Sequence, residues 1–343
     1  MLARTLFSII IGLSVLGLIG FSQSAFAAPY VLDNGPGDGT LNVGVDGFGA
    51  FGLSSGSDTT DAFYDPVGAV GSSATTFESA IAIRTDLAMG TRDFLASGFI
   101  GSSGGLANPI VIGTPTSGSS SFSNSGLSFT LEQTLTPTFT GPMQTGTVLT
   151  QTYTITSSVP FEIVRYLDGD LRFDGSLVDG GGRLILGDGT EVLFETDSAT
   201  GSSTDTTFVG ITGEGGIIPI SNRYEIDQYD GLLDGIILGT DLDNIITGDS
   251  GDADEFIDAG NGYDVTLAIR NTFQPGTTVY VTKTIFGSGA PEDIIITPVG
   301  GTIIPIDSMT LMISGFQSIS FWMIPLGIIS IASGAYLTRR QWK

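Results

Sequence analysis

Acidic side chains are the residues of this sequence best suited to do chemistry. Segment 223–270 holds twelve of them, and no basic residue lies between its two terminal arginines. Within it Asp249, Asp252, Asp254 and Asp258 lie closest together, with glycines between or beside them. Glycine turns can aim carboxylate and carbonyl oxygens at a hard cation, and calcium prefers such oxygen ligands. The spacing predicts a calcium site at these four aspartates, with a solvated acidic loop between strands as the alternative.

The physical case for a cation is charge repulsion, because clustered carboxylates raise one another's pKa unless a counter-charge is present. The segment resembles the glycine–aspartate calcium repeats of secreted proteins, since Asn244, Asp254 and Asp264 recur every ten residues, close to the nonapeptide period of those repeats. Residues 252–258 do not form an EF-hand loop, because the glycine at the sixth position and the distal glutamate are missing. The resemblance therefore implies calcium held by turns.

A second group of charged residues, segment 165–174, contains two arginines and three aspartates. Arg165 with Asp168, or Asp170 with Arg172, could form ion pairs at the end of a strand. Two carboxylates could instead serve glycoside hydrolysis, one as acid and the other as base or nucleophile. Structural ion pairing and a carbohydrate cleft are the two interpretations of this segment.

Composition excludes several classes of function. The 343 residues include no histidine and no cysteine, which removes imidazole bases, Ser-His-Asp triads, thiolate nucleophiles and disulfides. Twelve basic against 36 acidic side chains leave a net charge of −24, which argues against a nucleic-acid partner. Residues 47–52 match G-x-G-x-x-G and residues 52–56 match G-x-S-x-G, without the strand–helix pattern or the histidine that those motifs need. Both are predicted to be turn glycines, and no catalytic residue is predicted.

The segments that must position these groups have the sequence pattern of β-strands. Leu127, Phe129 and Leu131 fall on one face of a predicted strand, and residues 147–155 and 277–286 alternate in the same way. Helical periodicity is absent from the body of the chain. The fold class predicted is all-β, a large two-sheet antiparallel β-sandwich with a supersandwich-like form as one version, plus one C-terminal transmembrane helix.

Turn signals refine this picture. Residues 183–186 and 191–195 flank a Gly-Asp-Gly-Thr turn and predict a hairpin. The Gly/Ser-rich segment 113–125 is either a linker between two domains or a long loop within one sandwich. Residues 151–175 (QTYTITSSVPFEIVRYLDGDLRFDG) resemble the large secreted β-sandwiches of carbohydrate-binding and mutarotase-like proteins. The resemblance implies a two-sheet sandwich and carries no catalytic residue to this chain.

The N-terminus predicts export. Residues 1–27 combine Arg4, an apolar run over 6–21 and an Ala-Phe-Ala cleavage site at 25–27. These are the three parts of a signal peptide, and a retained membrane helix is the alternative. We therefore expect the mature chain to begin at Ala28.

The C-terminus predicts an anchor within residues 309–338. Residues 318–337 contain no charge, and twenty residues of helix span about 30 Å, the thickness of the bilayer core. Arg339 and Arg340 follow, and positive residues remain on the cytoplasmic side of a membrane. A buried core helix is the alternative to this transmembrane segment.

Together the two ends resemble archaeal and bacterial cell-surface proteins with C-terminal sorting tails. Here the tail is Ile-Pro-Ile-Asp-Ser at 304–308, then the apolar helix, then the arginines, without the Pro-Glu-Pro tripeptide of the best-known version. The resemblance implies an exported, membrane-anchored protein with an extracellular domain at 28–290, a stalk at 291–308 and a basic cytoplasmic tail at 339–343.

The function that these features favour is a non-enzymatic cell-surface protein. Its β-sandwich would serve envelope structure, adhesion or ligand binding, with calcium as a stabilising cofactor. The partners expected are the membrane, through the C-terminal helix, and carbohydrate or other surface proteins. The alternative is a carbohydrate-active enzyme that uses Asp/Glu pairs in a cleft of the sandwich.

Overall fold

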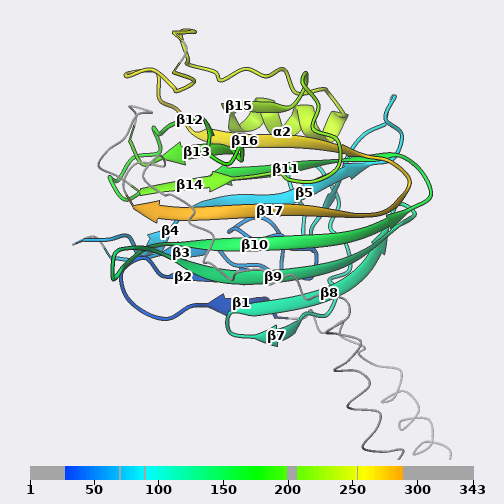
Figure 1. Cartoon of the computed structure of the whole chain (residues 1–343), viewed down its shortest axis with the longest axis horizontal. Coiled ribbons are helices and arrows are strands. Elements are labelled where there is room, and N and C mark those ends of the chain that lie inside the picture. Colours follow the sequence, from blue (N-terminus) through cyan, green and yellow to red (C-terminus); the bar gives the residue numbers. More distant parts are fainter. Residues whose placement is uncertain (1–27, 69–70, 89, 199–206, 253, 289–343) are drawn as a thin grey trace, which may run out of the picture. The chain divides into compact units, whose positions relative to one another are not determined.

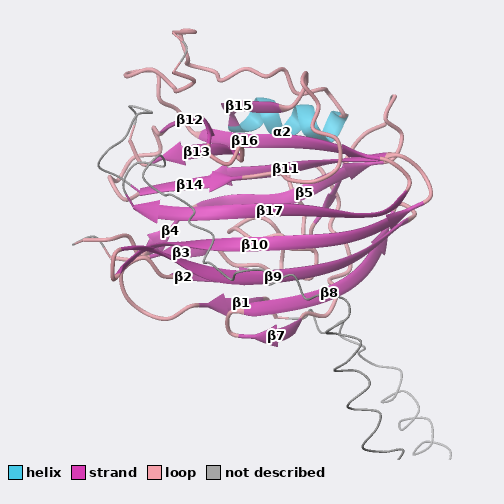
Figure 2. Cartoon of the chain, viewed as in Figure 1, coloured by secondary structure: helices cyan, strands magenta, loops and turns pink. Residues whose placement is uncertain are grey.

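The computed structural model describes residues 28–288, except 69–70, 89, 199–206 and 253. The described chain forms three antiparallel sheets of eight, five and four strands (Figure 1). Strands make up almost all of its regular structure (Figure 2). The all-β prediction is therefore confirmed, and the two expected sheets are joined by a smaller third one.

The eight-stranded sheet is the largest, and its central strands run side by side across Figure 1. The buried face of β9 carries Leu127, Phe129 and Leu131, as their alternation predicts. The predicted hairpin is present as β12 and β13, which pair antiparallel. In spatial order the strands are β12 (Gly180–Ile185), β13 (Glu191–Thr196), β14 (Thr207–Ile211), β17 (Gly276–Ser288), β10 (Met143–Ser157), β9 (Leu127–Thr140), β8 (Ser117–Asn124) and β7 (Ile112–Thr114).

The two other sheets complete the sandwich. The five-stranded sheet comprises β15 (Tyr224–Gln228), β16 (Val265–Phe273), β11 (Phe161–Gly169), β5 (Thr76–Arg84) and β6 (Asp93–Leu95). The four-stranded sheet comprises β1 (Tyr30–Asp33), β2 (Leu41–Val45), β3 (Ala62–Tyr64) and β4 (Ser73–Ala74). Apolar side chains from all three sheets share one core cluster.

Strand β11 is buried along its whole length because both of its faces are covered. Phe161 and Ile163 face the eight-stranded sheet and pack in a cluster with Tyr153 and Tyr280. Val164 and Tyr166 lie on the opposite face, in a cluster that includes three side chains of helix α2. The charged residues of this strand therefore lie in the interior, where each needs a polar partner.

Helix α2 (Tyr229–Leu238) lies in the acidic segment, where a loop was the expectation. Its apolar face, formed by Leu232, Leu233 and Ile236, covers the five-stranded sheet beside β15 and β16 (Figure 2). The helix ends at Gly239, whose φ of 80° is the left-handed conformation that favours glycine at a helix C-terminus. Burial of three aliphatic side chains outweighs the low helix propensity of the glycines within it.

Arginines meet a buried glutamate between α2 and the five-stranded sheet. Glu162 is fully buried, and its carboxylate forms ion pairs with Arg84 at 2.6 Å, Arg92 at 2.7 Å and Arg270 at 2.8 Å. Burial alone would raise the pKa of Glu162, but the arginines outweigh it and hold this pKa below its ordinary value. Arg92 also donates to the Thr240 carbonyl at 2.7 Å, which ties the end of α2 to the cluster.

The Gly/Ser-rich segment 113–125 is neither a linker nor a loop. It contributes β7 and β8, which form a hairpin at one edge of the eight-stranded sheet. Small polar side chains suit this position because one face of β8 is buried, and Ser120 donates to the Gly47 carbonyl there. Glycine and serine composition was therefore a poor guide to disorder in this segment.

The predicted termini lie outside the described residues. This applies to the signal peptide 1–27, the stalk 291–308, the anchor 309–338 and the basic tail 339–343. Within the residues that are described, no helix is both long and apolar enough to cross a membrane. Export and anchoring stay predictions from the sequence.

A buried aspartate organises the turn that contains the first glycine motif. Asp46 is fully buried, and its carboxylate accepts the N–H groups of Phe48 and Ala50, both at 2.9 Å, and of Ser97 at 2.7 Å. Residues 47–52 form a turn here, as expected for this motif. Burial raises the pKa of Asp46 to about 7, although the three N–H donors oppose the increase.

We predict that Asp46 makes stability depend on pH. In the folded state the group keeps its proton up to about pH 7, whereas the unfolded chain releases it near 3.8. The stabilisation that protonated Asp46 contributes is complete below about pH 3.8, and it is lost as the pH rises through about 7. Urea unfolding of wild type and Asp46→Asn should show the stability difference falling by about 1 kcal/mol between pH 5 and 6. A difference that is constant with pH would contradict the raised pKa.

Candidate functional site

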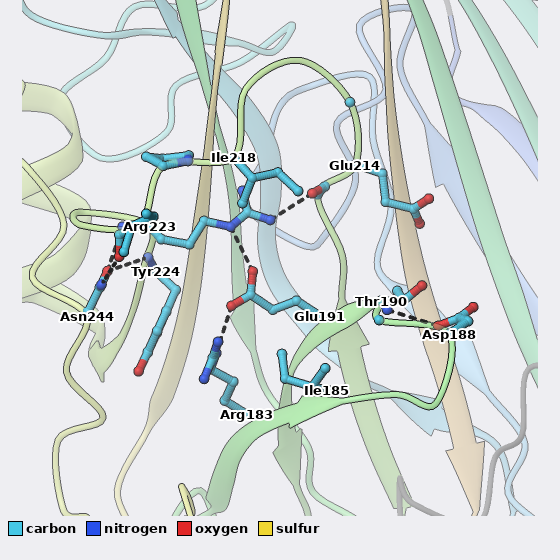
Figure 3. Close-up of a pocket in the computed structure, with 15 residues that line it drawn as sticks. Arg183, Ile185, Asp188, Thr190, Glu191, Glu214, Ile218, Arg223, Tyr224 and Asn244 are labelled. Carbon is cyan, nitrogen blue, oxygen red and sulfur yellow. Dashed lines mark hydrogen bonds and ion pairs between the residues drawn. The ribbon is translucent and has the colours of Figure 1, made fainter.

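A pocket of about 620 Å³ opens beside the β12–β13 hairpin. The hairpin supplies Arg183, Ile185, Asp188, Thr190 and Glu191 to its wall (Figure 3). The remaining lining residues come from the loop after β14, the start of β15 and the acidic segment, and they include Glu214, Ile218, Pro219, Ile220, Arg223, Tyr224 and Asn244. The pocket therefore joins one edge of the eight-stranded sheet to one edge of the five-stranded sheet.

A chain of ion pairs forms the floor of the pocket (Figure 3). Glu191 accepts from Arg223 and Arg183, both at 2.7 Å, one on each carboxylate oxygen. Arg183 continues the chain to Glu255 at 2.7 Å, and its guanidinium lies 4.7 Å from the centre of the Tyr224 ring. Because Glu191, Arg183 and Arg223 each have two or more partners, these three side chains are pre-organised.

Further hydrogen bonds hold Arg223 and the start of β15 in place. Arg223 is buried and donates to the Gly213 carbonyl and the Asn271 side chain, both at 2.8 Å. The side-chain oxygen of Asn244 accepts the N–H of Arg223 at 2.6 Å and that of Tyr224 at 3.2 Å. Asn244 was considered in the sequence as part of a calcium-type repeat, and in the structure it anchors the pocket wall instead.

The carboxylates that line the pocket are already engaged. Glu191 lies between two guanidinium groups, and Glu214 pairs with Lys283 at 2.7 Å. Asp188 accepts the N–H of Thr190 at 2.9 Å, which lowers its pKa. A general acid needs a carboxyl group with a raised pKa. The lining residues therefore present a polar surface whose carboxylates are already paired.

Three of the four predicted metal residues come together. One oxygen from each of Asp249, Asp252 and Asp254 lies within 4.8 Å of the others. Each also closes a local turn by accepting an N–H two residues ahead. The Asp258 carboxylate lies outside this group of three and accepts the N–H of Ser250 at 2.8 Å. Calcium at these residues stays a prediction.

The charged side chains of segment 165–174 do not form one group, because strand β11 places them on different faces. The expected pair of Arg165 with Asp168 does not form, because side chains three apart in a strand point to opposite faces. Arg165 instead donates to the hydroxyls of Ser79 at 2.7 Å and Thr284 at 3.1 Å. The other expected pair does form, with Asp170 and Arg172 at 3.0 Å.

A group of buried carboxylates was not found by sequence reasoning. Asp168 is the last residue but one of β11, Asp179 precedes β12 and Glu195 lies on β13, and all three are at most 2% exposed. One carboxylate oxygen of each has no hydrogen-bond partner in the part of the chain that is described. Nothing in their spacing indicates this cluster, because the three residues belong to different strands of two sheets.

The buried carboxylates perturb one another. Burial, and then the charge of Asp264, raises the pKa of Asp168 to about 9. Burial also raises the pKa of Asp179 to about 8 and that of Glu195 well above its ordinary value. The charge of Asp179 adds to the increase at Glu195. The charge of Arg172, at the surface, opposes the raised pKa of two acidic neighbours of this cluster, Asp170 and Asp264.

Comparisons with known proteins add little. No protein-family model matches the chain, and no curated protein does. Among solved structures, the chain is similar to a GalM/aldose epimerase homologue from C. elegans, with 12% sequence identity and a TM-score of 0.31. That match covers 77% of this chain and 99% of the other. No residue or activity is carried over from it.

Proposed function

We propose that this protein is a non-enzymatic cell-surface protein whose β-sandwich binds a carbohydrate ligand in the pocket beside the β12–β13 hairpin. The observation that carries the proposal is the ion-pair chain Arg223–Glu191–Arg183 that lines the pocket and continues outside it to Glu255. It fixes donors and acceptors before a ligand arrives, which lowers the cost of binding.

The lining chemistry suits a polyhydroxylated ligand. Thr190, Asn244 and the outer N–H groups of Arg183 offer hydrogen bonds to hydroxyl groups. At the mouth of the pocket, Ile218 and Ile220 are 59% and 98% exposed. Exposed aliphatic side chains next to a polar floor can cover the apolar face of a sugar ring. The cell-surface location comes from the predicted signal peptide and anchor.

The test is a glycan array probed with the full chain in detergent micelles, followed by titration of the best ligand. Arg183→Gln should weaken binding about tenfold, because it removes the group that links Glu191 to Glu255. Arg172→Gln is the matched control, since it makes the same chemical change at an exposed arginine outside the pocket. It should bind like wild type.

Two results would contradict the proposal. If no glycan binds, or if Arg183→Gln and Arg172→Gln bind equally, the pocket is not a carbohydrate site. If the bound glycan is cleaved or isomerised on incubation, the alternative of a carbohydrate-active enzyme is favoured instead.

A further inference from the structure

The charged groups of the pocket beside the β12–β13 hairpin do not balance. Three carboxylates and two guanidinium groups line it, and these belong to Asp188, Glu191, Glu214, Arg183 and Arg223. The ion-pair partners just outside the lining add one charge of each sign, because Glu255 pairs with Arg183 and Lys283 pairs with Glu214. Carboxylates therefore outnumber basic groups at the pocket, as they do in the chain as a whole.

Arg223 has little capacity to bind an anionic ligand, because its guanidinium is used within the protein. Its Nε donates to Glu191 at 2.7 Å, and its Nη2 donates to the Gly213 carbonyl at 2.8 Å. Its Nη1 donates to the Asn271 side chain at 2.8 Å and to the Arg270 carbonyl. These bonds use four of the five N–H groups of a side chain that is 5% exposed. No bidentate contact is left for a ligand carboxylate.

Arg183 is already neutralised by two carboxylates. Its Nε donates to Glu191 at 2.7 Å, and its Nη1 donates to both oxygens of Glu255, at 2.7 and 2.9 Å. The backbone holds Glu255 there, since the N–H of Arg183 donates to the Glu255 carbonyl at 3.0 Å and Gly182 forms a bridge with Phe256. A ligand carboxylate would therefore be a third anion beside one guanidinium group.

The other side of the pocket is acidic. Figure 3 shows Asp188 and Glu214 on one side of the pocket, away from the two arginines. Asp188 is exposed, and the N–H that Thr190 donates to it lowers its pKa, so it is charged at neutral pH. Lys283 forms an ion pair with Glu214 and balances one of these two charges. An anionic ligand would meet the other.

We propose that the pocket binds neutral sugars and rejects their acidic counterparts, with Asp188 and Glu214 as the residues that exclude the acidic ones. This inference rests on the carbohydrate site proposed above and names the class of sugar that it takes. Repulsion of the wrong ligand is a general source of specificity. A hydroxyl group can donate a hydrogen bond to a carboxylate, whereas a ligand carboxylate has no proton to donate.

The test uses matched pairs of sugars on the full chain in detergent micelles. The array carries oligomers of glucose, galactose and mannose, each beside the oligomer whose C6 is oxidised to a carboxylate, and bound pairs are titrated by calorimetry. Wild type should bind the neutral member at least about tenfold more tightly at low salt. In about 1 M NaCl, where the Debye length is about 3 Å, this ratio should fall at least threefold.

Variants identify the groups that discriminate. Glu214→Gln and Asp188→Asn each remove one negative charge, so each should lower the ratio of neutral to acidic affinity about threefold at low salt. Glu132→Gln is the matched control, because it makes the same chemical change at an exposed glutamate of β9 that lies outside the pocket lining. It should keep the wild-type ratio.

Two kinds of failure are distinguishable. Equal binding of the two members of a pair, preference for the acidic member, a ratio that does not change with salt, or equal ratios in Glu214→Gln and Glu132→Gln would overturn the charge selectivity and leave the carbohydrate site in place. Absence of binding by every sugar would overturn the proposed function and this inference with it.

Discussion

Replacing Glu162 with alanine should destabilise the protein by about 3–5 kcal/mol, the largest effect that we expect from one substitution. The change leaves Arg84, Arg92 and Arg270 facing one another without the carboxylate that neutralises them, and Arg84 and Arg92 are almost fully buried. For a domain of this size the melting temperature should fall by about 10 °C. Differential scanning calorimetry of the full chain measures it.

Glu214→Ala is the matched control for Glu162→Ala. It removes the partner of Lys283, in an ion pair whose side chains are 40% and 24% exposed. Solvent screens such a pair, so the loss should be about 0–1 kcal/mol. Equal melting temperatures for the two variants would mean that the arginine cluster is hydrated and that its burial is not what stabilises it.

The second large effect is expected at Gly169→Ala. The added Cβ would meet the Glu195 carboxylate, which is fully buried and has no free space to enter. Displacing this side chain should cost about 1–3 kcal/mol, as overpacking of a core does. Urea unfolding of the full chain measures the loss.

Gly187→Ala is the matched control for this substitution. It makes the same chemical change in the β12–β13 turn, where a new Cβ would meet no atom within 4 Å. Its stability should stay within about 0.5 kcal/mol of wild type. If Gly169→Ala unfolds at the same urea concentration as Gly187→Ala, Glu195 is not confined as described.

Local patterns in the sequence predicted the strands well. Alternation of Leu127, Phe129 and Leu131 identified β9, and a glycine-containing turn identified the β12–β13 hairpin. Helix α2 was missed because Gly231 and Gly235 interrupt a short apolar stretch among aspartates. Its stability comes from packing against the five-stranded sheet, a contact that no local pattern shows.

The candidate site was harder to predict. The exposed cluster of Asp249, Asp252 and Asp254 could be found because its members are neighbours in sequence. The pocket floor joins Arg183 to Arg223 through Glu191, and these contacts form only when two sheets meet. Strand periodicity could have excluded the pair of Arg165 with Asp168, since it places them on opposite faces.

The position of β17 decides when the eight-stranded sheet can close. This strand is the last described element, yet it lies inside the eight-stranded sheet, between β14 and β10. Its pairing joins Ser157 to Gly276 and Gly146 to Gly287, so the central ladder closes only when the chain up to that point is available. Pairing between such distant segments is slow. A chain released gradually from its N-terminus, at the ribosome or through the export predicted from residues 1–27, would therefore keep the central ladder open until β17 is available.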